Sequence, residues 1–193
     1  MSEIKIRVAT TDDAENILKI YSSFVEKTAV SFEYETPSLE KFRQRMKHIL
    51  KRFPFLAAEQ DGEIVGYAYT NFFAERAAYQ YCVESSIYLR DDVHRQGIGR
   101  KLYEQLEKFS RAQNFVCMYA KVASVDDGDD EFLTNASLKF HESLGFNVVG
   151  KMCKCGFKFN RWYDMLILEK VLAERIEKPK PILKFSSLTL FDI

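Results

Sequence analysis

Residues 87–103 constrain the fold of this chain more than any other stretch. A β-branched and aromatic run passes there through a short polar turn into an amphipathic segment that opens on Gly97 and Gly99. The first N–H groups of a helix have no partner within the helix and lie at the positive end of its dipole, so they bind anions. Glycines let a phosphate approach the backbone closely. The segment therefore predicts a strand, a turn and a helix N-terminus that together form a phosphate site.

The spacing of these glycines differs from two common nucleotide-binding motifs. No Lys-Ser/Thr pair follows the second glycine, as a P-loop requires, and no third glycine completes a dinucleotide fingerprint. Gly-x-Gly also occurs in ordinary strand-to-helix turns. The flanking sequence therefore has to decide between a phosphate site and an ordinary turn.

Length and charge favour one soluble domain that acts on a small molecule or a peptide. The 193 residues can enclose one continuous core. Basic and acidic side chains both number 28, so no net field attracts nucleic acid or an anionic membrane. Residues 1–25 lack the apolar core of a signal peptide, and no run of about 18 apolar residues suggests a membrane span. We expect a cytoplasmic protein that binds neither nucleic acid nor membrane.

The cysteines and the acidic segment do not indicate a metal site. Only one residue separates Cys153 from Cys155, and Cys82 and Cys117 do not form a matching pair. The segment 124–131 lacks the alternating ligand positions of a calcium loop. We expect buried or half-buried free thiols in a reducing compartment, a solvated acidic connection and no metal.

Hydrophobic periodicity predicts the remaining elements. Asp61-Gly62 supplies the turn of a β-hairpin, and the apolar tail after the last strand is expected to pack on the domain or on a partner. The predicted strands are residues 4–8, 55–59, 63–72, 81–89, 115–122, 148–157 and 162–168, and the predicted helices are residues 14–25, 38–50, 97–113 and 135–143.

This order of elements, the loop 95–100 and the segment HESLGF at 141–146 together resemble the GNAT acetyltransferases. The phosphinothricin N-acetyltransferase-like group is also similar in residues 28–32, 53–67, 76–79, 83–89 and 160–164. The resemblance implies an α+β GNAT fold (α/β three-layer), in which helices flank a central, mixed, mostly antiparallel twisted sheet. It assigns residues 1–170 to the GNAT domain and leaves 171–193 as a C-terminal tail.

The resemblance also implies acetyl-CoA as cosubstrate. The strand before the loop would splay away from its neighbour, and its backbone at Ile87, Tyr88 and Leu89 would bind the pantetheine arm. The diphosphate would be surrounded by Arg95, Gln96, Gly97, Ile98, Gly99 and Arg100. His94 departs from the usual Gln or Arg, with little loss expected because amides carry the contact. Asn135 lies one residue late for the asparagine that meets coenzyme A, and it could equally be a plain helix cap.

Two residues are candidates for catalysis. Acetylation of an ammonium group requires a base, and Glu84 matches the glutamate of the family's Glu-Ser-Thr/Ser segment. A carboxylate inside an apolar strand could also be a structural ion-pair partner. His141 occupies the position where the phosphinothricin group carries histidine, so we expect it to protonate the leaving thiolate or to contact the acceptor.

The resemblance places the acceptor pocket among aromatic side chains and one arginine. The arginine, Arg76, would pair with the carboxylate of an amino acid analogue, although Ala74 replaces a lysine that the family often has. The expected pocket residues are Phe32, Tyr34, Arg76, Tyr79, Trp162 and Tyr163.

These features predict an N-acetyltransferase that moves the acetyl group from acetyl-CoA to the primary amine of a small amino acid or analogue, such as phosphinothricin or methionine sulfoximine, in a ternary complex. The alternatives are a GNAT enzyme that acetylates a peptide or protein amine, and a module that binds acetyl-CoA without turnover. A homodimer to which the tail contributes is also expected.

Overall fold

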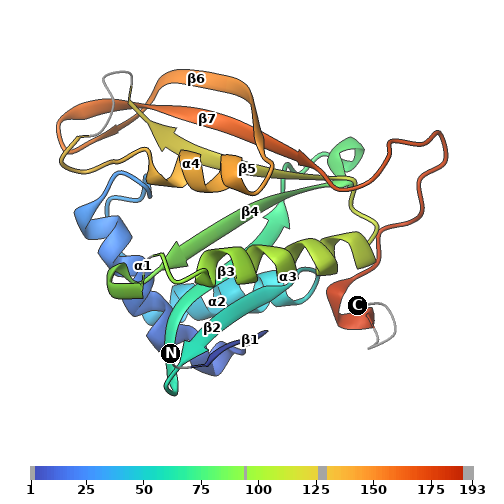
Figure 1. Ribbon diagram of the computed structural model, residues 1–193, viewed down its shortest axis with the longest axis horizontal. Helices are drawn as coiled ribbons and strands as arrows, with labels where there is room; N and C mark the ends of the chain where they lie inside the picture. Colours follow the sequence, from blue (N-terminus) through green and yellow to red (C-terminus); the bar gives the residue numbers. More distant parts are fainter. Residues whose placement is uncertain (1–2, 94, 126–129, 189–193) are drawn as a thin grey trace.

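The computed structural model describes residues 3–93, 95–125 and 130–188. Within them, seven strands form one mixed sheet and four α-helices pack on its faces (Figure 1). This confirms the predicted α+β architecture. The strands are β1 (Ile4–Val8), β2 (Phe55–Gln60), β3 (Glu63–Phe72), β4 (Cys82–Leu89), β5 (Cys117–Ser124), β6 (Asn147–Lys158) and β7 (Arg161–Val171), and the helices are α1 (Ala14–Lys27), α2 (Leu39–Leu50), α3 (Ile98–Ala112) and α4 (Ala136–Ser143).

The strand order is β1-β2-β3-β4-β5-β7-β6, and only β4 and β5 pair in parallel. The β2–β3 hairpin turns at Asp61 and Gly62, whose φ angles are 53° and 82°. Two consecutive left-handed residues are what the predicted Asp-Gly turn requires.

Alternation along β4 divides the site between the two faces of the sheet, because successive side chains of a strand point to opposite faces. Ser85 contacts Tyr103 of α3, whereas Glu84 lines a cavity together with His48 of α2. Tyr88 lies on the same face as Glu84 and packs on Tyr21 of α1. Figure 1 shows α3 and α4 in front of the sheet, with α1 and α2 behind it.

The parallel ladder between β4 and β5 is short. It runs from Cys82 opposite Cys117 to Ser85 opposite Ala120, although β4 continues to Leu89 and β5 to Ser124. Beyond the ladder β4 stays paired with β3, and β5 stays paired with β7. The two strands therefore separate, as Figure 1 shows and as the resemblance implies. Their facing edges present backbone hydrogen-bonding groups with no partner strand.

The described part of the C-terminal tail packs on its own chain, against the end of α3. The N–H of Leu183 donates to the carbonyl of Gln113 over 3.1 Å, and Gln113 Nε2 donates to the carbonyl of Leu183 over 2.9 Å. The Phe185 ring meets Phe109 edge to face at 4.9 Å. Leu190 and Phe191, two of the residues behind the sequence expectation, lie outside the described residues.

The expectation of buried or half-buried thiols is wrong for two of the four cysteines. Cys82 is half-buried and Cys117 is buried, but Cys153 and Cys155 are exposed. These two lie in a bulge of β6, where the pairing with β7 shifts between Met152 and Gly156. Regular alternation along a strand does not predict such a bulge.

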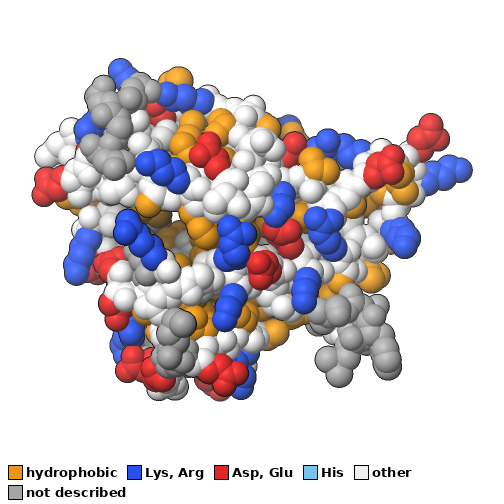
Figure 2. Space-filling view, in the orientation of Figure 1, with side chains coloured by type: hydrophobic (Ala, Val, Ile, Leu, Met, Phe, Trp, Pro, Cys, Tyr) orange, Lys and Arg blue, Asp and Glu red, His pale blue; other side chains and the backbone are white. Residues whose placement is uncertain are grey.

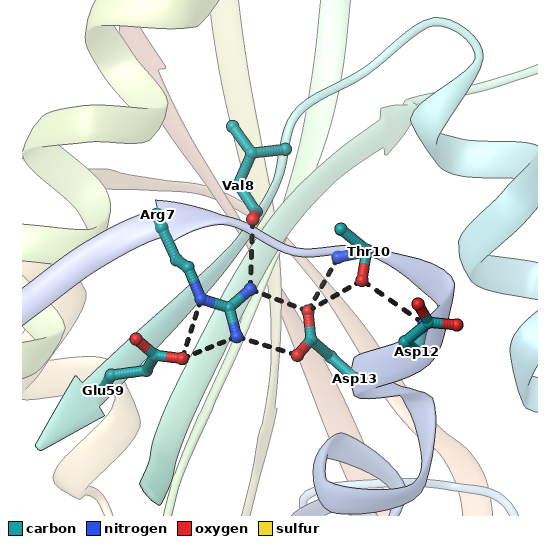
Figure 3. A network of polar contacts seen from close by, with 6 residues as sticks. All are labelled: Arg7, Val8, Thr10, Asp12, Asp13 and Glu59. Atoms are coloured by element: carbon teal, nitrogen blue, oxygen red, sulfur yellow. Dashed lines mark hydrogen bonds and ion pairs between the residues drawn. The ribbon is translucent and has the colours of Figure 1, made fainter. Parts of the chain in front are cut away.

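A partly buried charge cluster connects β1, β2 and the start of α1 (Figure 3). Arg7 donates two hydrogen bonds of 2.7 Å to the two carboxylate oxygens of Asp13, and its Nε donates to Glu59 over 2.7 Å. Asp13 also accepts from the N–H of Thr10 over 2.7 Å, in the capping box of the 3₁₀ turn Thr11–Asp13 that precedes α1. The hydrogen bonds from Arg7 lower the pKa of Asp13.

We expect Arg7→Gln to reduce the free energy of unfolding by about 2 kcal/mol at pH 7, because two partly buried carboxylates lose their partner. The folded-state pKa of Asp13 is depressed, so its contribution is fully present above about pH 4 and is lost as the pH falls through the folded pKa. The difference from wild type in urea unfolding should therefore shrink in acid. Lys19→Gln, which breaks an exposed pair with Glu15, is the control and should cost less than about 0.5 kcal/mol. An Arg7→Gln loss that is equal at pH 7 and pH 3 would contradict this account.

Candidate active site

The N-terminus of α3 has the geometry of an anion site. Gly97 occupies the N-cap with φ 78°, a left-handed conformation that glycine adopts without strain. The first helical hydrogen bond is donated by Lys101 to the carbonyl of Gly97, so the earlier N–H groups have no partner within the helix. The N-cap glycine has no side chain to cap these donors. The diphosphate of coenzyme A would fit this arrangement.

Around this terminus the predicted diphosphate residues have different environments. Arg95, Gln96 and Arg100 are exposed. Gln96 accepts a hydrogen bond from Gln60 over 3.3 Å, and Arg100 Nη2 donates to the carbonyl of Ser143 in α4 over 3.3 Å. The three side chains therefore remain at the surface, where they can turn toward a bound anion. His94 lies outside the described residues.

Ile98 and Gly99 can contribute to that site only through their backbone. Ile98 is buried in the core. A Cβ atom on Gly99 would lie 2.9 Å from the Phe140 ring of α4, which is closer than non-bonded atoms approach. The structure thus gives a different reason for Gly99 than the close approach of a phosphate: it lets α3 and α4 pack against each other.

The predicted pantetheine strand borders the gap between β4 and β5. Ile87, Tyr88 and Leu89 lie beyond the last paired residue, Ser85, and all three are only partly buried. The Tyr88 ring packs on Tyr67 and on α1, so it belongs to the core, whereas the strand backbone faces the gap. The backbone contact of this strand with the pantetheine arm stays a prediction.

Glu84 lines a cavity of about 380 Å³ on the α2 face of the sheet. Its carboxylate is ion-paired, with Oε2 at 2.7 Å from Nζ of Lys121 on β5. The side chain of Glu84 is 25% exposed and that of Lys121 is 38% exposed, so both are accessible from the cavity. The structural pairing that the sequence left open for Glu84 is therefore present together with access to a ligand. The other lining residues are His48, Tyr69, Asn71, Phe72, Phe73, Ala74, Glu75 and Ser86.

Sequence reasoning missed Lys121 and His48. A lone cation in the apolar run of β5 could have drawn attention to Lys121, just as Glu84 stood out in β4. Its partner, however, depends on the register between strands far apart in sequence. His48 lies at the exposed end of α2 and carried no motif.

His141 lies on the opposite face of the sheet, in a chain of buried hydrogen bonds. Its Nε2 is 2.7 Å from the hydroxyl of Tyr103, which is 3.0 Å from Ser85 Oγ. Its Nδ1 is 2.7 Å from the carbonyl of Ser137. A carbonyl only accepts, so Nδ1 carries the proton and Nε2 accepts from Tyr103.

This environment favours a positioning role for His141 over the acid role suggested by the sequence. The side chain is only 4% exposed, and burial lowers its pKa. The imidazole is therefore neutral at physiological pH, and its one proton is held by the Ser137 carbonyl. In this geometry His141 connects α4 to Tyr103 of α3 and, through Tyr103, to Ser85 of β4.

Four of the predicted aromatic pocket residues lie at the β6–β7 hairpin and do not line the Glu84 cavity: Phe32, Tyr34, Trp162 and Tyr163. Tyr34 donates a hydrogen bond to the carbonyl of Phe157, and Phe157 packs on Trp162 at 5.1 Å. Phe32 lies against Tyr163, which exposes no surface. Their contact with the acceptor stays a prediction.

A buried lysine holds the connection that carries Phe32 and Tyr34. Lys158 Nζ donates to the carbonyls of Val25, Thr28 and Ser31 over 2.6, 2.9 and 2.7 Å. The ammonium thereby satisfies carbonyls at the end of α1, as a C-terminal cation does, and desolvation lowers its pKa. Phe32 and Tyr34 are thus fixed against the β6–β7 hairpin.

Three other predicted residues do not line the cavity. Arg76 is exposed at the start of a 3₁₀ turn, Ala77–Tyr79. Tyr79 packs on Phe73, which lines the cavity. Asn135 stands at the N-cap of α4 without a side-chain capping bond to the described residues of that helix.

Figure 2 shows the α3–α4 face hollowed between its upper and lower halves, with hydrophobic side chains inside the hollow. No helix in the described part of the chain combines the length and apolar character needed to span a membrane.

Comparison with known proteins agrees with this geometry. Residues 6–167 match the family model of the acetyltransferase (GNAT) domain. The phosphinothricin N-acetyltransferase of Alcaligenes faecalis is 34% identical over 168 residues, which cover 86% of this chain and 82% of that protein. The L-methionine sulfoximine/L-methionine sulfone acetyltransferase of Pseudomonas aeruginosa is 33% identical over 167 residues, which cover 85% and 92%. The crystal structure of a GNAT phosphinothricin acetyltransferase from Sinorhizobium meliloti in complex with acetyl-CoA superimposes with a TM-score of 0.82 at 29% identity, covering 96% and 99%.

The chain therefore belongs to the GNAT acetyltransferase family, in its phosphinothricin N-acetyltransferase-like group. It is an acetyl-CoA-dependent N-acetyltransferase with the GNAT fold.

A negative charge introduced at position 97 tests the anion site. A Cβ atom there meets nothing within 4 Å, and both Asp and Asn tolerate the left-handed conformation. We expect Gly97→Asp to weaken acetyl-CoA binding by about tenfold or more, because a carboxylate then faces the diphosphate. Gly97→Asn has the same size without the charge and should bind nearly as wild type in isothermal titration calorimetry. Equal affinities for the Asp and Asn variants would rule out this placement.

Proposed function

We propose that this enzyme transfers the acetyl group of acetyl-CoA to the primary amine of a small amino acid or amino acid analogue, with Glu84 as the base. The observation that carries the proposal is the position of Glu84, which lies one residue before the end of the β4–β5 ladder and is open to the cavity. Its carboxylate therefore lies where an acceptor on the α2 face could approach the gap between the strands.

The chemistry follows from that position. The substrate ammonium loses a proton to Glu84, directly or through water, and the free amine attacks the thioester carbonyl. The new C–N bond forms and the C–S bond breaks, while the second proton of the nitrogen leaves for the thiolate or for solvent. Direct attack requires acetyl-CoA and acceptor to be bound together, and we propose such a ternary complex. His141 holds the junction of β4, α3 and α4, which borders the gap.

Size and charge of the cavity support a small acceptor. A volume of about 380 Å³ is at the small end of ligand pockets. The carboxylate of Glu84 and the ammonium of Lys121 suit a zwitterion. Two relatives are acetyltransferases of phosphinothricin and of methionine sulfoximine or sulfone. These substrates also favour a small amino acid analogue as the acceptor. A peptide acceptor would call for an open groove, and a binding module without turnover would not need an accessible carboxylate.

We expect Glu84→Gln to retain acetyl-CoA affinity but to lower the acetylation rate about 100- to 10,000-fold. The loss should shrink as pH rises, because more of the acceptor amine is then already neutral. Release of the coenzyme A thiol, followed with L-methionine sulfone from pH 6 to pH 10, measures the effect.

Glu75→Gln is the matched control, since it removes a carboxylate from the same cavity without touching the ion pair. A defect of Glu84→Gln that does not depend on pH, or an equal defect in Glu75→Gln, would count against Glu84 as the base.

We also propose that the enzyme acts in the cytoplasm as a homodimer. Large apolar side chains exposed on β6 and β7, among them Val148, Val149, Phe157 and Trp162, support an association surface. The described tail contacts its own α3, so β6 and β7 are the better supported surface. Light scattering should give the mass of two chains, and Val149→Asp should give one. A single-chain mass for the wild-type protein would refute the dimer.

A further inference from the structure

The acceptor cavity contains a cation that the mechanism above does not use. Lys121 Nζ lies 2.7 Å from Glu84 Oε2. Lys121 is one residue beyond Ala120, where the ladder ends on β5, and Glu84 is one residue before Ser85, where it ends on β4. The ion pair therefore joins the two strands at the point where they separate, and it occupies the carboxylate that has to receive the acceptor's proton.

An acceptor ammonium that approaches Glu84 has to compete with this lysine. If the acceptor brings only an amine, Lys121, whose side chain is 38% exposed, loses its ion-pair partner when the amine takes Glu84 and is left with water alone. If the acceptor carries a carboxylate beside the amine, that carboxylate can pair with Lys121. Glu84 and Lys121 then both keep an opposite partner.

We propose that Lys121 binds the α-carboxylate of the acceptor and exchanges Glu84 for it when the acceptor enters. The two groups of an α-amino acid are attached to one carbon atom, and the two protein groups that would receive them are already neighbours. The inference rests on the proposed function, and it adds the residue that selects amino acids over simple amines.

The positions of Arg76 and Ala74 favour this assignment. Arg76, the expected carboxylate partner, is exposed at the 3₁₀ turn and is absent from the described lining of the cavity. Ala74 does line the cavity, but it carries no charge. Of the described lining residues, Lys121 is the one Lys or Arg.

The test compares two acceptors with the same side chain and the same α-amine, L-methionine sulfone and its α-carboxamide. For wild type, kcat/KM should be higher for the acid. Lys121→Met should reduce kcat/KM for the acid by about tenfold or more, the worth of one charged hydrogen bond. The carboxamide should be turned over equally well or better, because no unpaired ammonium remains. Lys121→Arg retains the charge and should retain the preference for the acid.

Three outcomes would overturn the proposal. Equal losses for both acceptors would mean that Lys121 acts only by holding Glu84, and no change in either would mean that it does not take part. Loss of the preference in Arg76→Gln, with Lys121→Met unaffected, would make Arg76 the carboxylate partner. Circular dichroism checks folding, and Lys121→Gln supplies the same comparison if Lys121→Met does not fold. A wild-type enzyme that binds acetyl-CoA but acetylates neither compound would instead show that the proposed function itself fails.

Discussion

The separation of β4 from β5 is the constraint on which the rest of the site depends. The hydroxyl of Tyr103 lies 2.7 Å from His141 and 3.0 Å from Ser85, the last paired residue of β4. These polar atoms are buried, so each partner lost would leave another unsatisfied in the core. The single hydroxyl proton of Ser85 can be donated either to Tyr103 or to the carbonyl of Tyr119 on β5, which lies 3.1 Å from Ser85 Oγ. Two helices and both strands are thus tied together at the point where the pairing ends.

At this junction, neighbouring residues of β4 face opposite sides of the sheet. Because side chains alternate along β4, Glu84 faces the cavity beside α2 while its neighbour Ser85 faces α3. The turn before α3, to which we assign the diphosphate, follows the same strand, so a single element positions this turn and the carboxylate of Glu84. In the proposed mechanism the acceptor approaches the gap from the α2 face and meets the thioester there.

Local pattern was sufficient for most of the fold. The Asp61-Gly62 turn, the helical stripes and the glycine at position 97 act within a few residues, and each element they predict is present. The pair of Glu84 with Lys121 could not be predicted, because its partners are far apart in sequence and meet only through the strand register. The lowered pKa of His141 comes from burial, to which the ring of Tyr103 from another helix contributes. The bulge that exposes Cys153 and Cys155 interrupts the very alternation on which strand prediction relies.

A crystal structure of the enzyme with coenzyme A tests the central claim most directly. The account predicts that the pantetheine arm lies in the gap between β4 and β5, with its amides bonded to the backbone of residues 86–89, and that the diphosphate rests on the amides of residues 96–100. The Tyr103–His141 hydrogen bond should persist unchanged in the complex. Density for the arm on another surface, or pairing of β4 with β5 beyond Ser85, would contradict it.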